Sequence, residues 1–173
     1  MAEETKDKWL NYLSFTTVFI AVCATLASFK GGGYGTTALL SQSNASDQWA
    51  YYQSKSIKSY IYETQKENLE LQFSTATLNK EVLQKKIDSY AGKIKKYGEE
   101  KEHISKEAKG LEAIRDESKA HAERFGMAII FLQVSILLSS ISALTKKKIF
   151  WGISVIIGAV GVVYFINGFL IFF

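Results

Sequence analysis

The sequence contains no proline and a single cysteine. Because an interior proline costs a helix roughly 3 kcal/mol, its absence favours long, uninterrupted helices. One thiol, Cys23, excludes an intramolecular disulfide and leaves the redox compartment undetermined. A lipoprotein cysteine would follow small residues, and Val22 is too large for that pattern. We therefore interpret Cys23 as a membrane-embedded thiol.

Residue types that build catalytic and metal sites are also scarce. The two histidines, His103 and His121, are expected on a solvated helix surface, and no second cysteine could complete a zinc site. No Ser/His/Asp set, carboxylate pair in a cleft or redox motif can be assembled. The glycine-rich residues 30–35 lack the Lys-Ser or Lys-Thr of a phosphate-binding loop and predict a turn or hinge. We predict no enzymatic activity, no cofactor and no metal.

Charge of one sign does not dominate any large region. The net charge is +4, but residues 30–124 contain 16 basic and 14 acidic side chains. A nucleic-acid-binding protein normally presents a patch with a clear basic excess. Mixed signs at short spacing are typical of a solvated helix surface. The sequence therefore predicts no nucleic-acid partner.

Three long apolar runs contain no charged residue: residues 9–29, 126–145 and 149–173. About 20 residues, at 1.5 Å per residue, cross the roughly 30 Å hydrocarbon core of a bilayer. The first run has no basic segment before it and no A-x-A site after it, so it predicts a retained anchor, not a signal peptide. We predict an integral membrane protein with three transmembrane helices.

The second and third runs are separated only by Lys146, Lys147 and Lys148. So short a connection requires a tight antiparallel pair of helices. Short loops rich in lysine stay in the cytoplasm. This places the amino-terminal tail, residues 1–8, inside and the central domain, residues 30–125, outside. In a bacterium the location would be the inner membrane, with the central domain in the periplasm.

Polar residues inside the spans include Asn11, Gln133 and Asn167, but none is ionisable. Proton relays and pumps usually need a charged residue, so hydrogen bonding between helices is favoured over a polar pathway. The third span also has a small-residue face that permits close helix contact. Its members are Gly152, Ser154, Gly158, Ala159 and Gly161.

The central domain begins with a helical pattern over residues 36–73. One face carries Trp49, Tyr52, Ile57, Tyr60 and Ile61, whereas Ser54, Lys55, Lys58 and Ser59 are predicted to point elsewhere. Residues 74–79 are a candidate turn.

A second helix follows with apolar residues in alternating steps of four and three, which indicates a coiled-coil seam. The seam consists of Leu83, Ile87, Tyr90, Ile94, Tyr97, Lys101, Ile104, Ala108 and Leu111, with Lys101 as its charged exception. The spans before and after this domain must meet the same membrane face. An antiparallel helical hairpin satisfies that requirement. The overall fold class is therefore all-α, with an extramembrane hairpin or coiled coil between the first two spans.

Two stretches make the chain resemble a known family. Residues 45–55, ASDQWAYYQSK, and residues 141–148, ISALTKKK, followed by Trp151, resemble a bacterial family of small membrane proteins that is described only as a domain of unknown function. The resemblance covers nearly the whole chain. It implies a bacterial source and three spans, and it implies no activity or site residue.

We expect a non-enzymatic structural or interaction protein in the bilayer: a homo-oligomeric scaffold. The alternatives are an oligomeric channel and an accessory subunit of a larger membrane complex with other membrane proteins. Lys146, Lys147 and Lys148 are the expected topology determinants. The expected oligomer or partner interface consists of Trp49, Tyr52, Ile57, Tyr60, Leu83, Ile87, Tyr90, Ile94, Tyr97, Ile104 and Leu111.

Overall fold

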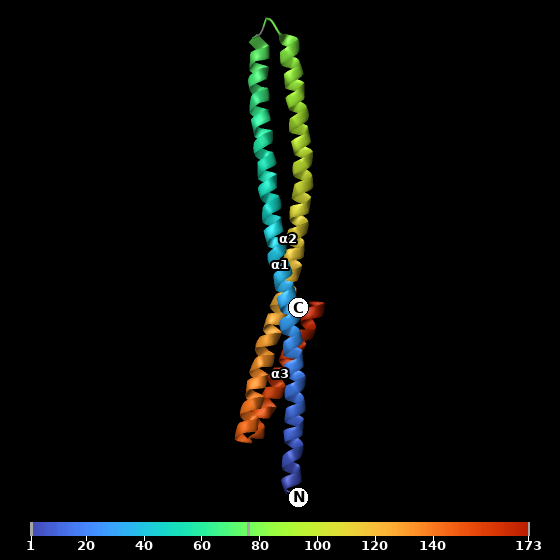
Figure 1. Ribbon diagram of the computed structural model, residues 1–173, viewed down its shortest axis with the longest axis vertical. Coiled ribbons are helices and arrows are strands. Elements are labelled where there is room, and N and C mark those ends of the chain that lie inside the picture. The colour runs from blue at the N-terminus through green and yellow to red at the C-terminus, as the bar shows by residue number, and fades with distance from the viewer. Residues whose placement is uncertain (1, 76, 173) are drawn as a thin grey trace. The chain divides into compact units, whose positions relative to one another are not determined.

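The computed structural model describes residues 2–75 and 77–172, with side chains described from residue 8 onward. It contains three helices: α1 (Ala2–Thr75), α2 (Lys80–Thr145) and α3 (Lys148–Leu170) (Figure 1). No strand occurs among the described residues. The prediction of an all-α protein is therefore confirmed.

Helix α1 runs without interruption through the glycine-rich segment, so the predicted hinge at residues 30–35 is wrong. A glycine inside a helix costs only about 1 kcal/mol relative to alanine, which flanking helix can offset. Gly31 has a packing role, because a Cβ there would lie 2.9 Å from Cβ of Phe125 on α2. The glycine thus permits close approach of the two helices.

The two connections are short and contain no glycine. Helix α1 ends at Thr75 and α2 begins at Lys80, which lies just beyond the segment expected to turn. Asn79 has a φ of 64°, a left-handed conformation that asparagine tolerates, and its carbonyl accepts hydrogen bonds from the amides of Val82 and Leu83. Between α2 and α3, Lys146 has a φ of 56°.

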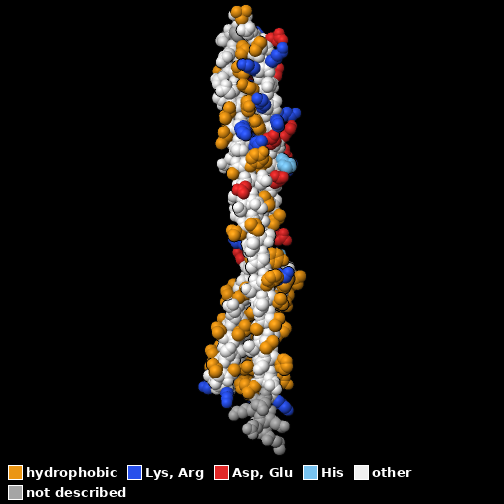
Figure 2. Space-filling view, viewed as in Figure 1, with side chains coloured by type: hydrophobic (Ala, Val, Ile, Leu, Met, Phe, Trp, Pro, Cys, Tyr) orange, Lys and Arg blue, Asp and Glu red, His pale blue; other side chains and the backbone are white. Residues whose placement is uncertain are grey.

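The chain divides into two compact units. The hairpin unit, Leu40–Ile114, consists of the adjoining parts of α1 and α2. The three-helix unit, Met1–Leu39 with Arg115–Phe173, contains the other parts of α1 and α2 together with α3. Figure 2 shows most charged side chains over the hairpin unit, whereas apolar side chains cover much of the three-helix unit.

All three helices are long and apolar enough to cross a membrane. Most side chains in their apolar windows are not buried inside the protein. Phe15 and Phe29 of α1 and Ile156 of α3, for example, are all exposed. Soluble proteins rarely expose so much contiguous apolar surface.

Candidate interaction surfaces

In the hairpin unit, the α2 seam faces α1 of the same chain. Ile87, Ile104 and Ala108 are buried. The other seam residues are half-buried: Leu83, Tyr90, Ile94, Tyr97, Lys101 and Leu111. The ring centroid of Tyr62 on α1 lies 5.2 Å from that of Tyr90 and 5.9 Å from that of Tyr97. This part of the expected oligomer interface is thus occupied within one chain.

The side of α1 that faces this seam has its own regular spacing. Ten of its buried or half-buried residues follow steps of four and three: Ser41, Ala45, Gln48, Tyr52, Lys55, Ser59, Tyr62, Lys66, Leu69 and Phe73. Half of this set is polar, so a sequence reading based on hydrophobicity misses it. The steps of four and three along α1 are the sequence pattern from which this packed face could be predicted.

Two residues expected to point away from the packed face belong to this inner set, so that expectation is wrong. Ser59 is only 3% exposed, and its hydroxyl donates a hydrogen bond of 2.8 Å to Oε1 of Glu63. Nζ of Lys55 lies 2.7 Å from Oε2 of Glu100 on α2. A small serine and a lysine that is ion-paired to the opposite helix can therefore both pack between two closely spaced helices, where the sequence predicts apolar residues.

The Lys55–Glu100 pair is the main electrostatic contact across the hairpin. Contact with Glu100 raises the pKa of Lys55 to about 12. The same contact with Lys55 lowers the pKa of Glu100 below its ordinary value of 4.5. Both shifts favour the charged forms, so the pair stays ionised across the physiological range.

The residues of the aromatic face predicted on α1 lie in two different environments. Trp49 Nε1 donates a hydrogen bond of 3.0 Å to Oε1 of Glu112, and the ring of Tyr52 lies 5.9 Å from Nζ of Lys101. These two residues contribute to the hairpin itself. Ile57 and Tyr60, in contrast, are exposed.

The exposed part of α1 forms a second regular stripe. We define the outer stripe as Ile57, Ile61, Thr64, Asn68 and Leu71, which again follow steps of four and three. Ile57 is 61% exposed, Ile61 55% and Leu71 70%, and Tyr60 lies beside them. Within the described hairpin unit, nothing covers this stripe.

In the three-helix unit, serine hydroxyls join α2 to α3. The hydroxyls of Ser135 and Ser154 each donate to the other residue's carbonyl at 2.8 Å. Oγ of Ser139 lies 2.7 Å from Oγ of Ser154 and can donate to it. All three side chains are buried. The hydrogen-bonding capacity of the serines is thus used between helices.

Glycines of α3 allow the same close contact. A Cβ at Gly161 would lie 2.8 Å from Cγ and 3.0 Å from the backbone nitrogen of Leu132. A Cβ at Gly158 would lie 2.8 Å from both Ile20 Cδ1 and Ser135 Oγ. Of the predicted small-residue face, Gly152 and Ala159 are exposed. The packed part of that face is therefore Ser154, Gly158 and Gly161.

Of the polar residues in the predicted spans, Asn11 and Gln133 are exposed, whereas Asn167 is buried. The side-chain oxygen of Asn167 accepts a hydrogen bond of 2.6 Å from the backbone amide of Phe172. The backbone carbonyl of Asn167 accepts a second one from the backbone amide of Ile171. Asn167 therefore satisfies backbone groups at the end of α3.

His121 is half-buried in the three-helix unit, so its expected position on the solvated surface is wrong. Nδ1 lies 2.8 Å from the carbonyl oxygen of Gly168, and the ring stacks on Tyr34 with centroids 4.4 Å apart. Since a carbonyl only accepts, the proton must be on Nδ1. Gly168 also approaches Phe125 too closely for a side chain. His121 thus fastens the end of α3 to α2. His103 is exposed, as expected.

An apolar groove of about 490 Å³ lies between α1 and α3 of the three-helix unit. Its walls are Phe15, Thr16, Phe19, Ile20, Val155, Gly158, Ala159 and Val162. The only polar side chain among them is Thr16, whose hydroxyl accepts a hydrogen bond of 3.2 Å from Nε1 of Trp151.

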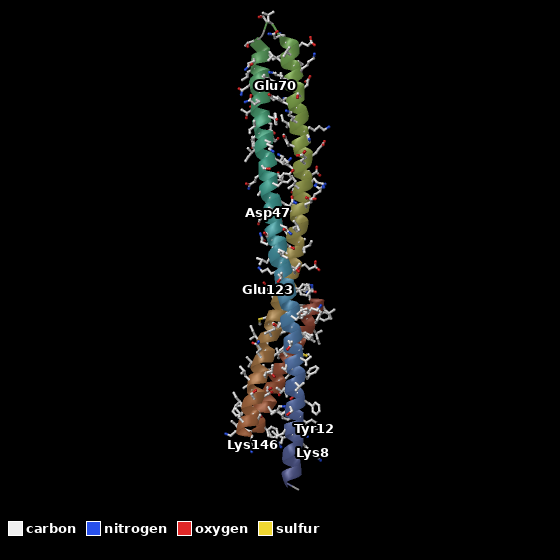
Figure 3. The ribbon with its side chains drawn as sticks, viewed as in Figure 1. Lys8, Tyr12, Asp47, Glu70, Glu123 and Lys146 are labelled. Carbon is white, nitrogen blue, oxygen red and sulfur yellow. The ribbon has the colours of Figure 1, made fainter. Side chains whose placement is uncertain are left out.

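One end of the three-helix unit is rich in lysine. Lys146, Lys147 and Lys148 are all exposed, and Nζ of Lys148 lies 5.9 Å from the ring centroid of Trp9. Lys8, Tyr12 and Lys146 lie at this end (Figure 3). We call Lys8 with Lys146, Lys147 and Lys148 the lysine end.

Within the described residues, no group of three or more histidine, cysteine or acidic side chains could hold a metal ion. The contacts above hold helices together and leave an apolar stripe, an apolar groove and a lysine end available for other molecules. Exposed apolar surfaces of this kind are candidate interaction sites.

Residues 9–171 match the model of a protein family described as "Domain of unknown function (DUF4337)". Because the match covers nearly the whole chain, the protein belongs to this family. Nothing among curated proteins or solved structures matches the chain.

Proposed function

We propose that the protein is a homo-oligomeric scaffold of the bacterial inner membrane. Three helices cross the bilayer, and the hairpin unit outside it associates with copies of itself through the outer stripe. The observation that carries the proposal is this exposed stripe of Ile57, Ile61 and Leu71 with heptad spacing. The proposed interface contains fewer residues than the one expected from the sequence, because Trp49, Tyr52 and the α2 seam pack within one chain.

Membrane insertion is supported by the three apolar helices and by their outward-facing side chains. In water the exposed phenylalanines and isoleucines would favour aggregation, whereas lipid tails solvate them without cost. The backbone is helical over residues 9–29, 126–145 and 149–170, as the hydrocarbon core requires.

The hairpin unit has a small core of its own. Among the described residues between 40 and 114, Ile87 and Ile104 are the large apolar side chains that are buried. Small helical units usually need a further source of stability, and oligomerisation is one of the common sources. Burying a large apolar side chain contributes roughly 1.5–3 kcal/mol, so covering the outer stripe would supply that need.

A second copy fits the outer stripe better than an unrelated surface does. Copies inserted in one membrane with the same orientation present their α1 helices in parallel. Two parallel stripes with steps of four and three interlock in register, as in a coiled coil. Asn68 would then face its own counterpart, and a buried asparagine at such a position fixes the register of a parallel pair.

The proposed orientation has the loop of Lys146, Lys147 and Lys148 in the cytoplasm and the hairpin unit outside. In a Cys23→Ser background, Lys147→Cys should react with a membrane-impermeant thiol reagent from the cytoplasmic side. Ser89→Cys on the hairpin should react from the other side. Labelling of both positions from the same side would contradict the three-span arrangement, and exchanged sides would invert the orientation.

Self-association is tested by crosslinking in native membranes. In the Cys23→Ser background, Asn68→Cys should form disulfide-linked dimers under mild oxidation, because paired positions would lie within the 4.4–6.8 Å that a disulfide spans between Cα atoms. Ser89→Cys, which is exposed on α2, is the matched control and should remain monomeric.

Replacing part of the outer stripe should weaken the oligomer. Ile57→Ser with Ile61→Ser should raise its dissociation constant at least tenfold, since each residue loses apolar burial. Val82→Ser removes a similarly exposed apolar side chain from α2 and should have no effect. A monomeric mass of the unmodified protein under mild extraction would refute the scaffold. A mass that includes unlike subunits would indicate an accessory subunit instead.

A further inference from the structure

We infer that the groove between α1 and α3, together with the lysine end, forms a binding site for an anionic phospholipid. This inference rests on the proposed insertion of the three-helix unit in a membrane. The apolar groove would receive an acyl chain, and the lysines would bind the phosphate group. The site lies entirely within the three-helix unit.

The chemistry of the groove selects a hydrocarbon occupant. Its volume of about 490 Å³ is within the range of small-molecule sites. Seven of its eight lining residues have no polar side-chain atom. The hydroxyl of the eighth, Thr16, is already bonded to Trp151 Nε1 and to the carbonyls of Tyr12 and Leu13. No polar group in the groove therefore requires a polar ligand.

The spacing along the helices matches a lipid with its head at the lysine end. Lys148 precedes Val155 by seven residues on α3, and Lys8 precedes Phe15 by seven on α1. Seven residues correspond to about 10 Å along a helix. Trp151 lies between, at the level where tryptophans mark the membrane interface. The phosphate would thus lie just outside the interface and the acyl chain just inside it.

The charge of the lysine end selects the type of lipid. Lys146, Lys147 and Lys148 are consecutive and exposed, and no ion pair to them occurs among the described residues. Basic residues beside membrane helices attract anionic lipid head groups. Helix α3 also begins at Lys148 without a side-chain cap, so its positive dipole end adds to the field.

The same charge argues against a second copy as the occupant of the groove. A copy with the same membrane orientation would bring its own Lys146, Lys147 and Lys148 to the same level. Like charges at close range oppose such pairing, whereas an anionic lipid neutralises them. A lipid is therefore the occupant that satisfies both the groove and the lysines.

The inference is tested by native mass spectrometry of the intact protein from bilayers of phosphatidylglycerol and phosphatidylcholine with identical acyl chains. Phosphatidylglycerol should be retained in preference to phosphatidylcholine. Lys147→Gln with Lys148→Gln should reduce that preference by about fivefold per lysine. Ala159→Phe, which fills the groove, should reduce retention of both lipids severalfold. Val160→Phe, on an exposed part of α3 outside the groove, is the matched control and should change neither.

Equal retention of the two lipids by the unmodified protein would overturn the inference, and so would unchanged retention in Ala159→Phe. If that variant instead changes the oligomeric mass, the groove receives a protein helix. Ala159 is exposed, so its replacement does not disturb the packed core. The same spectra report oligomeric mass, and the thiol labelling reports insertion. A membrane-inserted oligomer without lipid preference would thus refute the lipid site and leave the scaffold intact.

Discussion

Alanine substitutions at two glycines of α3 should have different effects on the stability of the three-helix unit. Both Gly161→Ala and Gly152→Ala gain the helix preference of alanine, about 1 kcal/mol. At Gly152 the new methyl group meets nothing within 4 Å, so the gain should remain. At Gly161 the methyl group would lie 2.8–3.0 Å from Leu132, including its backbone nitrogen, which cannot move aside as a side chain can.

Overpacking of this kind costs about 1–3 kcal/mol. Because the helix preference is common to both variants, the difference between them isolates the overpacking. We expect Gly161→Ala to be less stable than Gly152→Ala by about 1–3 kcal/mol, which is fivefold to 150-fold in the unfolding equilibrium.

The measurement is reversible unfolding in mixed micelles, followed by tryptophan fluorescence. In a Trp49→Phe background, the remaining tryptophans, Trp9 and Trp151, both report on the three-helix unit. Equal stabilisation by the two alanine substitutions would refute the close contact between α2 and α3 at Gly161.

Three predictions concern the hairpin unit and are measured by hydrogen exchange of its backbone amides in the intact protein. Ile104→Ala should destabilise the unit by at least 2 kcal/mol, since Ile104 is buried, and should accelerate exchange at least about 30-fold. Ser59→Asp should destabilise it by about 1–3 kcal/mol, because the new carboxylate would be buried beside Glu63. Stability should decline as the pH falls below about 4.5, because contact with Lys55 lowers the pKa of Glu100 in the folded state below its ordinary value.

The sign of the pH effect follows from proton binding. Below pH 4.5 the unfolded chain takes up a proton at residue 100 before the folded protein does, so acid favours unfolding. Glu100→Gln should remove this part of the acid sensitivity.

Val82→Ala, at an exposed position of α2, is the control for Ile104→Ala and should change exchange little. A loss at Val82 equal to that at Ile104 would contradict the assigned packing.

Sequence reasoning succeeded where one physical property dominates. The helices and the three runs apolar enough to cross a membrane follow from helix propensity and hydrophobicity, which a sequence displays directly. Sequence reasoning was wrong where packing depends on the size of a side chain more than on its hydrophobicity. The inner face of α1 contains Lys55 and Ser59, and hydrophobicity alone assigned them to the wrong side.

Two further errors have a similar origin. The glycines of residues 30–35 suggested a hinge, but Gly31 lies in a continuous helix opposite Phe125. His121 looked like a surface residue, but its partners are Gly168, 47 positions away, and Tyr34 on another helix. No local pattern predicts a contact between such distant segments.

The sequence by itself determined that this is an all-helical protein with three helices long and apolar enough to cross a membrane, because helix length and apolarity are properties of continuous segments. Only the tertiary structure decided which apolar side chains are buried inside the chain and which stay exposed. In the tertiary structure, the α2 seam and Tyr52 pack within the hairpin unit, whereas Ile57 and Ile61 are exposed. The groove lies between α1 and α3. The physical reason is that burial depends on which helix lies opposite, and that neighbour comes from a distant part of the chain.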